Sequence, residues 1–200
     1  MLDIPIIKPR TESASKVTDG RITLDHTKHL TDAQINRVID NMRLDFQHEF
    51  SCVGLVPQLV GLQMVRSSFV SVYAAIDGQP EFILGAVPQI QGVFGIWGFG
   101  TNKTKRAVPA LTRYVNDCLI PGAFGSGIAT RLEIRVPAQS QWSIDWLCGA
   151  CGFVPEAMLP GYSDVPHVQL RFSNSEYINR YVHVSAASDA ADGGTGTGTH

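Results

Sequence analysis

Two residues in the middle of the chain, Asp77 and Gly78, constrain its fold more than any others. They stand between a β-rich run at residues 69–76 and a second apolar run at 82–84. A two-residue hairpin turn of this kind needs positive φ at both positions, which Asp and Gly tolerate. A further turn at 88–92 leads into a third β-rich run at 93–99. We therefore expect three antiparallel strands in a meander at the centre of the fold.

Helical periodicity precedes this meander. Thr31 and Asp32 can open a helix, because a small polar side chain accepts the N–H groups of a first turn. Apolar residues then recur at three- and four-residue spacing as far as Phe50. A second helix is predicted at 55–66, with Pro57 in its first turn, where a missing N–H group costs little. The pattern thus predicts one long amphipathic helix followed by a short one.

Helices and strands alternate after the meander. The predicted elements are a helix from about Arg106 that Pro121 and Gly122 end, a half-buried strand at 130–136, a helix from Ser140 to Gly152, and strands at 156–159 and 167–172. Runs of strands with helices between them indicate an α+β domain. We expect a mixed, mostly antiparallel sheet flanked by helices.

The two ends of the chain differ from this centre. Residues 1–30 are rich in Ser, Thr, Lys and Asp, and we expect a flexible N-terminal arm with a short strand at 22–24. Residues 31–172 form the predicted domain. Residues 173–200 are predicted to be a C-terminal extension that ends in a flexible Gly/Thr tail.

Composition excludes several classes of protein. Hydrophobic residues make up 44% of the chain, enough for a core without metal or disulfide staples. The formal net charge of −2 argues against a dedicated nucleic-acid binder, so we expect no nucleic-acid partner. No apolar stretch approaches the ~18 residues that span a bilayer, and the N-terminus lacks the pattern of a signal peptide. We expect the chain to stay in the cytoplasm in which it is made.

Two of the four cysteines, Cys148 and Cys151, form a CxxC motif. It is either a redox pair or half of a metal site, or it is two small buried residues near a helix end. A zinc site needs two more ligands, and neither Cys52 nor Cys118 belongs to a second such motif. We favour the packing role and predict no metal site.

Two segments resemble a known family. Residues 146–153 are similar to the end of the last helix of GNAT acetyltransferases, which finishes in Leu-Gly-Phe. Residues 96–101 and 111–115 are similar to GNAT-like proteins of tailed bacteriophages, the group that includes podoviral internal virion protein A. The resemblance covers residues 50–172 and implies a GNAT-like fold.

The resemblance also implies a cofactor site. In this family acetyl-CoA lies where two parallel strands separate, with its pyrophosphate at the N-terminus of the next helix, whose N–H groups favour an anion. The corresponding cofactor-binding residues are Gly100, Thr101, Asn102, Lys103, Lys105 and Arg106. Only one glycine of the family's loop pattern remains, so we expect weakened phosphate binding. A solvated basic turn is the alternative interpretation of the three cations.

The family's catalytic acid, a tyrosine, is also replaced. The resemblance puts Cys148 at its position, and Gln141 where the family usually has Asn. A thiol of pKa about 8.5 can in principle donate a proton, so Cys148 is a candidate acid. Glu133 is a candidate general base, although Arg131 and Arg135 on the same face of its strand favour a salt-bridge ladder.

Two hypotheses follow. The first is a phage virion or assembly component that keeps a non-catalytic GNAT-like fold for protein–protein contacts and needs no cofactor. Its partners would be other virion proteins (capsid, portal or tail components) or further copies of itself, first in the host cytoplasm and then in the virion. The alternative is an acetyl-CoA-dependent N-acetyltransferase with an atypical phosphate loop. The first predicts that Trp97 or Trp142 fills the gap between the strands at 93–99 and 130–136, and the second predicts an open cleft.

Overall fold

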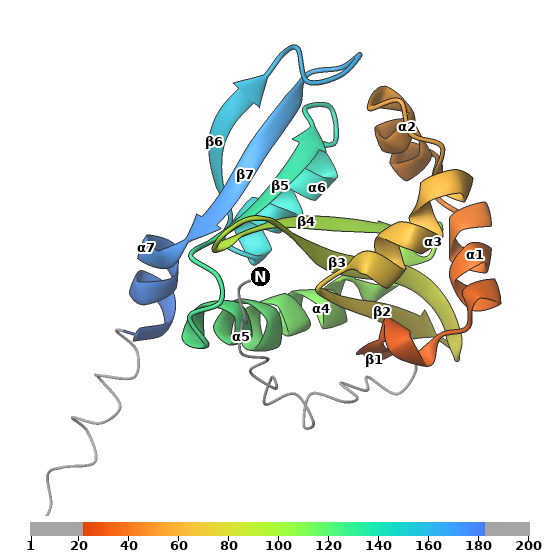
Figure 1. The fold of residues 1–200 in the computed structure, drawn as a ribbon, viewed down its shortest axis with the longest axis horizontal. Helices are drawn as coiled ribbons and strands as arrows, with labels where there is room; N and C mark the ends of the chain where they lie inside the picture. The colour runs from red at the N-terminus through yellow and green to blue at the C-terminus, as the bar shows by residue number, and fades with distance from the viewer. Residues whose placement is uncertain (1–21, 183–200) are drawn as a thin grey trace, which may run out of the picture.

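The computed structural model describes residues 22–182, which build one seven-stranded sheet with helices packed against it (Figure 1). The strands are β1 (Ile22–His26), β2 (Val70–Ile76), β3 (Gln79–Ile90), β4 (Val93–Gly100), β5 (Arg131–Pro137), β6 (Val154–Leu159) and β7 (His167–Ser173). The α-helices are α1 (Asp32–Asp40), α2 (Leu44–Cys52), α3 (Pro57–Ser67), α4 (Thr104–Tyr114), α5 (Ile120–Gly125), α6 (Gln141–Asp145) and α7 (Asn174–Tyr177). A 3-10 turn (Thr27–His29) follows β1, and π-helical turns follow α4 (Val115–Leu119), α6 (Trp146–Ala150) and α7 (Ile178–Val182).

The strands lie side by side in the order β1-β2-β3-β4-β5-β7-β6. Every neighbouring pair is antiparallel except β4 and β5, which run parallel. Asp77 (φ 52°) and Gly78 (φ 78°) make the tight turn between β2 and β3. The predicted α+β fold with a mixed, mostly antiparallel sheet is confirmed.

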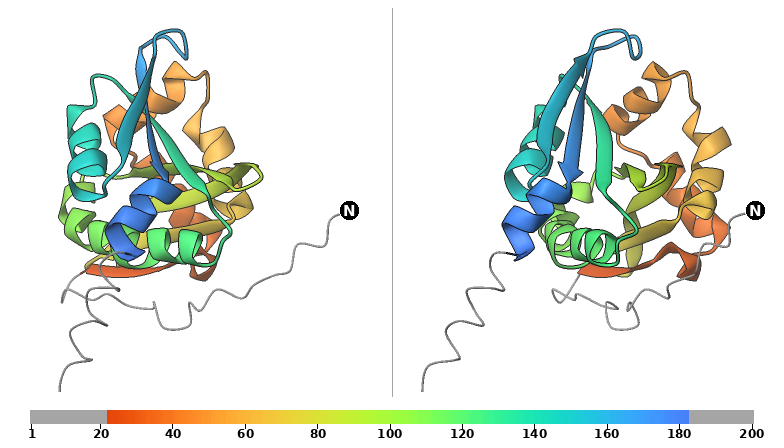
Figure 2. Two further views of the ribbon diagram at one scale, coloured as in Figure 1. Left: turned by 90° about the vertical axis from the view of Figure 1, so that its left-hand side faces the viewer. Right: turned by 60° about the vertical axis from the view of Figure 1, so that its left-hand side comes forward.

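Helices α1 and α3 contact the sheet at β3 and β4, whereas α4 contacts β1, β2 and β3. The fully buried side chains include Ile39 of α1, Ile83 of β3 and Leu111 of α4, so both groups of helices share a core with the sheet. Strands β5, β6 and β7 rise away from the part of the sheet that β1 to β4 form (Figure 2).

The long helix predicted from Thr31 to Phe50 is wrong, because the structure has two helices there. Thr31 does cap α1, since its side chain accepts the Gln34 N–H and the Gln34 side chain accepts the Thr31 N–H in return. The chain leaves the helix at Met42, which forms a β-bridge with Thr101. The Arg43 N–H then donates to the Gly100 carbonyl at 2.9 Å. A contact with a distant loop therefore interrupts the apolar periodicity.

The helix after β4 also differs from the prediction. It begins at Thr104 rather than near Arg106, and Pro121 and Gly122 do not end it. A π-helical turn carries the chain into α5, where Pro121 lies in the first turn. Pro121 has no N–H group to donate, and it lies where the hydrogen-bond pattern changes from the π turn to the α-helix.

The folded unit extends past both predicted limits of residues 31–172. Strand β1 pairs with β2 along its whole length, so the predicted short strand belongs to the sheet. Beyond β7, the Tyr181 hydroxyl donates to the Asn116 carbonyl at 2.8 Å, and Tyr177 stacks on Phe124 with ring centroids 5.3 Å apart. The remainder of the predicted arm and the Gly/Thr tail lie outside the described residues. Within residues 22–182, no helix has the length and apolar character needed to cross a membrane.

Candidate functional site

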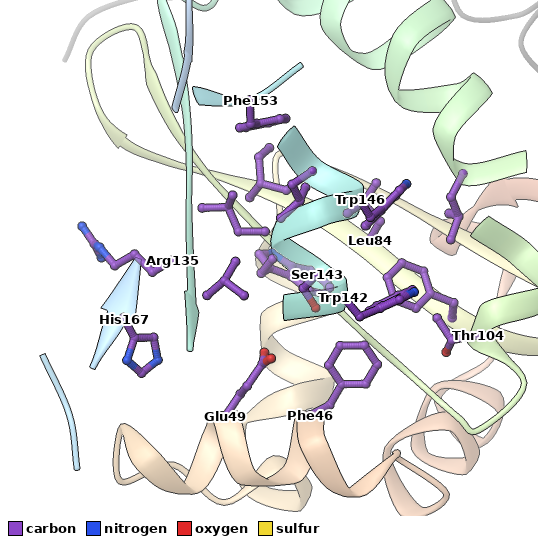
Figure 3. A pocket seen from close by; sticks show the side chains of 18 of the residues that line it. Phe46, Glu49, Leu84, Thr104, Arg135, Trp142, Ser143, Trp146, Phe153 and His167 are labelled. Carbon is purple, nitrogen blue, oxygen red and sulfur yellow. The ribbon is translucent and has the colours of Figure 1, made fainter. Parts of the chain in front are cut away.

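A cleft of about 280 Å³ opens where β4 and β5 separate. The two strands pair only over residues 93–95 and 131–133, and beyond that point their distance increases. Side chains of the strands and of α2, α4 and α6 surround the space (Figure 3). Trp97 and Trp142 belong to its wall but leave the space open. The expectation that one of them fills the gap is therefore wrong.

The wall of the cleft is mostly apolar. Its aliphatic and aromatic residues include Leu84, Ile96, Val108, Leu111, Val115, Leu119, Ile134, Val136, Leu147 and Phe153. Its polar side chains are Glu49, Thr104, Arg135, Ser143, Tyr162 and His167. Figure 3 places Glu49, Arg135 and His167 toward one side of the cleft, which we call its polar end, whereas Thr104 lies at the opposite side and Ser143 between them.

Strand β4 presents an unpaired edge to the cleft. The Thr101 N–H donates to the Glu81 carbonyl of the β3 side, whereas the Gly100 carbonyl accepts from Arg43 on the other side. In an antiparallel ladder, the backbone N–H and C=O groups of successive residues point alternately toward and away from the neighbouring strand. Ile96 and Gly98, like Gly100, therefore turn these groups away from β3. These groups face the gap left by β5.

Glu49 of α2 is the titratable group that sequence reasoning missed. Burial raises its pKa to about 7, the negative charge of Asp45 adds to this, and Arg43 and a hydrogen bond from Ser140 oppose it. Its carboxylate points into the cleft (Figure 3). The available signal was spacing, since Glu49 lies three residues after Phe46 and therefore on the same helix face.

Arg135, Tyr162 and His167 pack together at the polar end. The Arg135 guanidinium lies 5.1 Å from the centre of the Tyr162 ring, and the His167 ring meets the same ring edge-on at 5.0 Å. His167 is buried, and its Nδ1 lies 2.9 Å from the Val165 carbonyl, to which it can donate. Stacking holds these side chains as one wall of the cleft.

The predicted phosphate loop, residues 100–106, is closed by internal hydrogen bonds. The Thr101 hydroxyl accepts the Lys103 N–H at 3.2 Å, and the Thr101 carbonyl accepts the Thr104 N–H at 3.0 Å. The Arg106 N–H donates to the Lys103 carbonyl at 3.0 Å. These are N–H groups that a phosphate at this helix end would need.

The buried carboxylate of Glu81 lies beneath the same loop and pairs with one of its cations, Lys103. Glu81, 1% exposed, accepts hydrogen bonds from the Thr101 hydroxyl at 2.5 Å, from Lys103 Nζ at 3.1 Å and from Arg37 Nη2 at 3.2 Å. Burial raises the pKa of Glu81, but these three hydrogen bonds outweigh it and lower the pKa below its ordinary value. Glu81 is thus a fixed anion beneath the loop. The signal in the sequence was an acid at the start of an otherwise apolar strand.

The six predicted cofactor-binding residues lie together but outside the wall of the cleft. Arg106 pairs with Asp77 at 3.5 Å, Lys103 pairs with Glu81, and Lys105 and Asn102 are exposed. Thr101 is buried, and a Cβ on Gly100 would lie 2.5 Å from the Glu81 carbonyl oxygen. Of the segment 100–106, only Thr104, which is not among the six, lines the cleft.

Neither candidate catalytic residue contributes to the wall of the cleft. Glu133 binds Arg131 at 2.5 Å and lies 3.9 Å from Arg135, which is the salt-bridge ladder that the alternation favours. Cys148 is half-buried on the π-helical turn, and burial together with the charge of Asp145 raises its pKa. The acid and base roles of these two residues stay predictions.

The tryptophans are held by polar contacts. Trp146 Nε1 donates to the Thr112 hydroxyl of α4 at 2.8 Å, and Trp142 stacks on Trp146 with centroids 6.1 Å apart. The Arg43 guanidinium lies over the Trp142 ring, 5.2 Å from its centroid. Helix α6 is thereby fixed beside α4 at the edge of the cleft.

A scan against protein-family models finds no match, and a search of curated proteins finds none either. Solved structures do match. The aminoglycoside acetyltransferase AAC(6')-Ib in complex with coenzyme A is 16% identical, with a TM-score of 0.55 over 80% of this chain and 98% of that chain. RimJ of Mycobacterium smegmatis in complex with CoA-disulfide is 16% identical, with a TM-score of 0.56 over 84% of this chain and 89% of that chain.

An acetyltransferase of the GNAT family from Streptococcus pneumoniae is 14% identical, with a TM-score of 0.54 over 76% of this chain and 98% of that chain. This chain has the GNAT fold. Identity at this level establishes the fold alone, so the activity has to be argued from the site.

The residues of this chain fit coenzyme A only in part. The unpaired edge of β4 and the cleft beside it suit a narrow extended arm. The loop at the start of α4 suits a pyrophosphate poorly, because the N–H groups of Lys103, Thr104 and Arg106 and the Lys103 side chain already have partners within the protein. The cleft of the GNAT fold is present here, but its phosphate anchor is occupied from within.

Proposed function

We propose that this protein uses the GNAT fold for protein–protein contacts and not for acetyl transfer, as a virion or assembly component of a tailed bacteriophage. The observation that carries the proposal is the buried carboxylate of Glu81. It holds Thr101 and Lys103, two of the residues that would otherwise meet the phosphates of acetyl-CoA. The Thr101 hydroxyl and the Lys103 ammonium group are thereby engaged within the protein and are not free for a phosphate.

An apolar surface supports the contact role. Three large side chains of the α2–α3 region project into solvent, with Leu44 80%, Val56 49% and Leu59 77% exposed. Contact with another protein would remove these apolar side chains from water, which is favourable. The partners expected are capsid, portal or tail components, or further copies of the chain. The virion assignment itself rests on the resemblance of residues 96–101 and 111–115 to phage proteins.

Calorimetric titration of the full chain with acetyl-CoA tests the loss of the cofactor site. We expect no heat of binding at millimolar cofactor. A variant with Lys103, Lys105 and Arg106 changed to Ala is the control, and micromolar binding that this variant loses would refute the proposal. The virion assignment has its own test, since mass spectrometry of purified particles of the phage that encodes the chain should detect it. Its absence from the particles would remove that assignment.

The open cleft favours a second candidate, an N-acetyltransferase. Glu49 has a pKa of about 7 at the polar end of the cleft, which suits a general base at neutral pH. It could take a proton from an amine as the amide bond forms and the thioester C–S bond breaks, and the proton would end on the leaving thiolate. The N–H of Gly98, which faces the gap, is placed to polarise a carbonyl there.

This second candidate has a separate measurement. A panel of amines with acetyl-CoA is assayed for release of free thiol, with wild type beside Glu49→Gln. Turnover that falls at least about a hundredfold in Glu49→Gln would support the enzyme. Equal background rates in both proteins would exclude Glu49 as the base.

A further inference from the structure

We infer that the cleft between β4 and β5 binds a single unbranched apolar chain, of the kind found in fatty acids. This goes beyond the proposed function, because it assigns a ligand class to a cavity that protein contacts and the phosphate loop leave unused. The argument rests on which side chains form the wall, where the polar groups lie and how the cleft opens.

The inner wall of the cleft consists of apolar side chains that have little solvent-exposed surface. Leu84 and Ile96 come from the sheet, Leu111 and Val115 from α4 and its π turn, and Phe153 from the start of β6, and each is less than a tenth exposed. These residues come from four separate parts of the chain. Away from the polar end, Thr104 and Ser143 are the polar residues among a mainly apolar lining, which is typical of sites for apolar ligands.

Two wall residues show that the space is accessible. Val108 lies on the cleft side of α4 and Ile134 on β5, and both remain partly exposed although they face inward. Apolar surface left in contact with water favours a ligand that removes it. A polar chain would gain hydrogen bonds only along the β4 edge, at Ile96 and Gly98, and would lose them against the helices.

The polar end of the cleft fits the head of such a chain. The Arg135 guanidinium is exposed there and lies 3.9 Å from Glu133, and its several N–H donors allow it to pair with a second carboxylate as well. The neighbouring Glu49 carboxyl is protonated below its pKa of about 7, so it need not repel an anionic head in mildly acidic solution. An apolar tail inside and a charged head at Arg135 describe a fatty acid.

The test uses the full chain and the series hexanoate, octanoate, decanoate and dodecanoate, with binding followed by tryptophan fluorescence and calorimetry. Trp97, Trp142 and Trp146 all belong to the wall, so a bound chain should change their emission. We expect the dissociation constant to fall about fourfold per added methylene until the cleft is full. No binding at any chain length, or affinity that does not depend on length, would overturn the inference.

Matched variants locate the site. Val108→Trp and Ile134→Phe add bulk inside the cleft and should each weaken decanoate binding at least about tenfold. Val154→Phe adds similar bulk on the exposed side of β6 and should leave binding unchanged. Circular dichroism checks that each variant is folded, and decanoate binding that survives in folded Val108→Trp and Ile134→Phe would overturn the inference.

Two ligands that carry the same ten-carbon acyl group, decanoate and decanoyl-CoA, are compared. Decanoyl-CoA should bind no more tightly than decanoate, because the phosphate loop is closed by its own hydrogen bonds. A binding advantage of decanoyl-CoA that disappears in the triple alanine variant would contradict the proposed function while leaving the apolar-chain site intact. The two proposals therefore fail on different results.

Discussion

Thr101 donates its hydroxyl to the buried carboxylate of Glu81 at 2.5 Å, and its backbone N–H donates to the Glu81 carbonyl at 2.8 Å. One residue of β3 thus holds the loop before α4 through both its side chain and its backbone. Lys103 and Arg37 complete the arrangement around the same carboxylate. The predicted phosphate loop, residues 100–106, is therefore held in place by hydrogen bonds within the protein.

Replacement of Glu81 by Gln should destabilise the protein. The amide keeps the size of the side chain but leaves Arg37 and Lys103 without their buried counter-ion. Because both cations are partly exposed, we expect a loss of about 1–3 kcal/mol in the free energy of unfolding, less than for a fully buried pair. Urea unfolding at neutral pH measures it. Asp77→Asn, in the exposed pair with Arg106, is the control and should cost less than about 1 kcal/mol.

The stability of the protein should depend on pH through Glu49. Burial raises its pKa from 4.5 to about 7 in the folded state. Between these values the folded protein keeps a proton that the unfolded chain has released, so the free energy of unfolding falls as the pH rises through 7. The free energy of unfolding should be lower above pH 7 than below pH 4.5 by about 3 kcal/mol from this group.

The comparison for that prediction is Glu49→Gln, which has no proton to lose at this position. Urea unfolding from about pH 5 to about pH 8 should give a shallower decline in the variant than in wild type. Parallel curves for the two proteins would mean that the pKa of Glu49 is near its ordinary value in the folded state.

Local patterns in the sequence were sufficient for most of the sheet. The Asp77-Gly78 turn, the alternating strand at 130–136 and the left-handed Gly152 (φ 78°) each depend on residues that are neighbours in the chain. The GNAT-like order of elements follows from such signals. Their physical basis is short-range, since turns need positive φ and half-buried strands need alternation.

The site was less predictable because distant residues form it. The break at Met42 depends on a bridge to Thr101, and Glu81 acquires its role only from Arg37 and Lys103. These contacts join residues far apart in the sequence, so no short-range pattern of residue types predicts them. The family's loop pattern directed attention to residues 100–106, but it could not show that the Glu81 carboxylate binds Thr101 and Lys103 of this loop.

Gly85 allows the Trp97 indole to lie flat against β3. A Cβ at this position would lie 2.2 Å from Cζ2 of the indole, so Gly85→Ala must displace the ring. The displacement breaks the hydrogen bond from Trp97 Nε1 to the Ser68 hydroxyl (3.1 Å) and the stacking on Phe99 (5.5 Å between centroids). We expect a loss of about 1–3 kcal/mol and a changed near-ultraviolet circular dichroism spectrum. Gly149→Ala meets no atom within 4 Å and should leave both unchanged, and an unaltered spectrum in Gly85→Ala would refute this packing.

The thiols of the CxxC motif should be unreactive in the folded protein. Burial raises the pKa of Cys151 to about 12, with Arg180 opposing the shift, and burial and Asp145 raise the pKa of Cys148. Only the thiolate is nucleophilic, whereas redox motifs depend on a lowered pKa. Iodoacetamide at about pH 7.5 should therefore alkylate Cys148 slowly and Cys151 not at all, as mass spectrometry of peptides can resolve. In denaturant both should react at the rate of a free cysteine, which is the control. Fast alkylation of Cys148 in the folded chain would instead reveal a lowered pKa, and it would restore this residue as a candidate for proton transfer or redox chemistry.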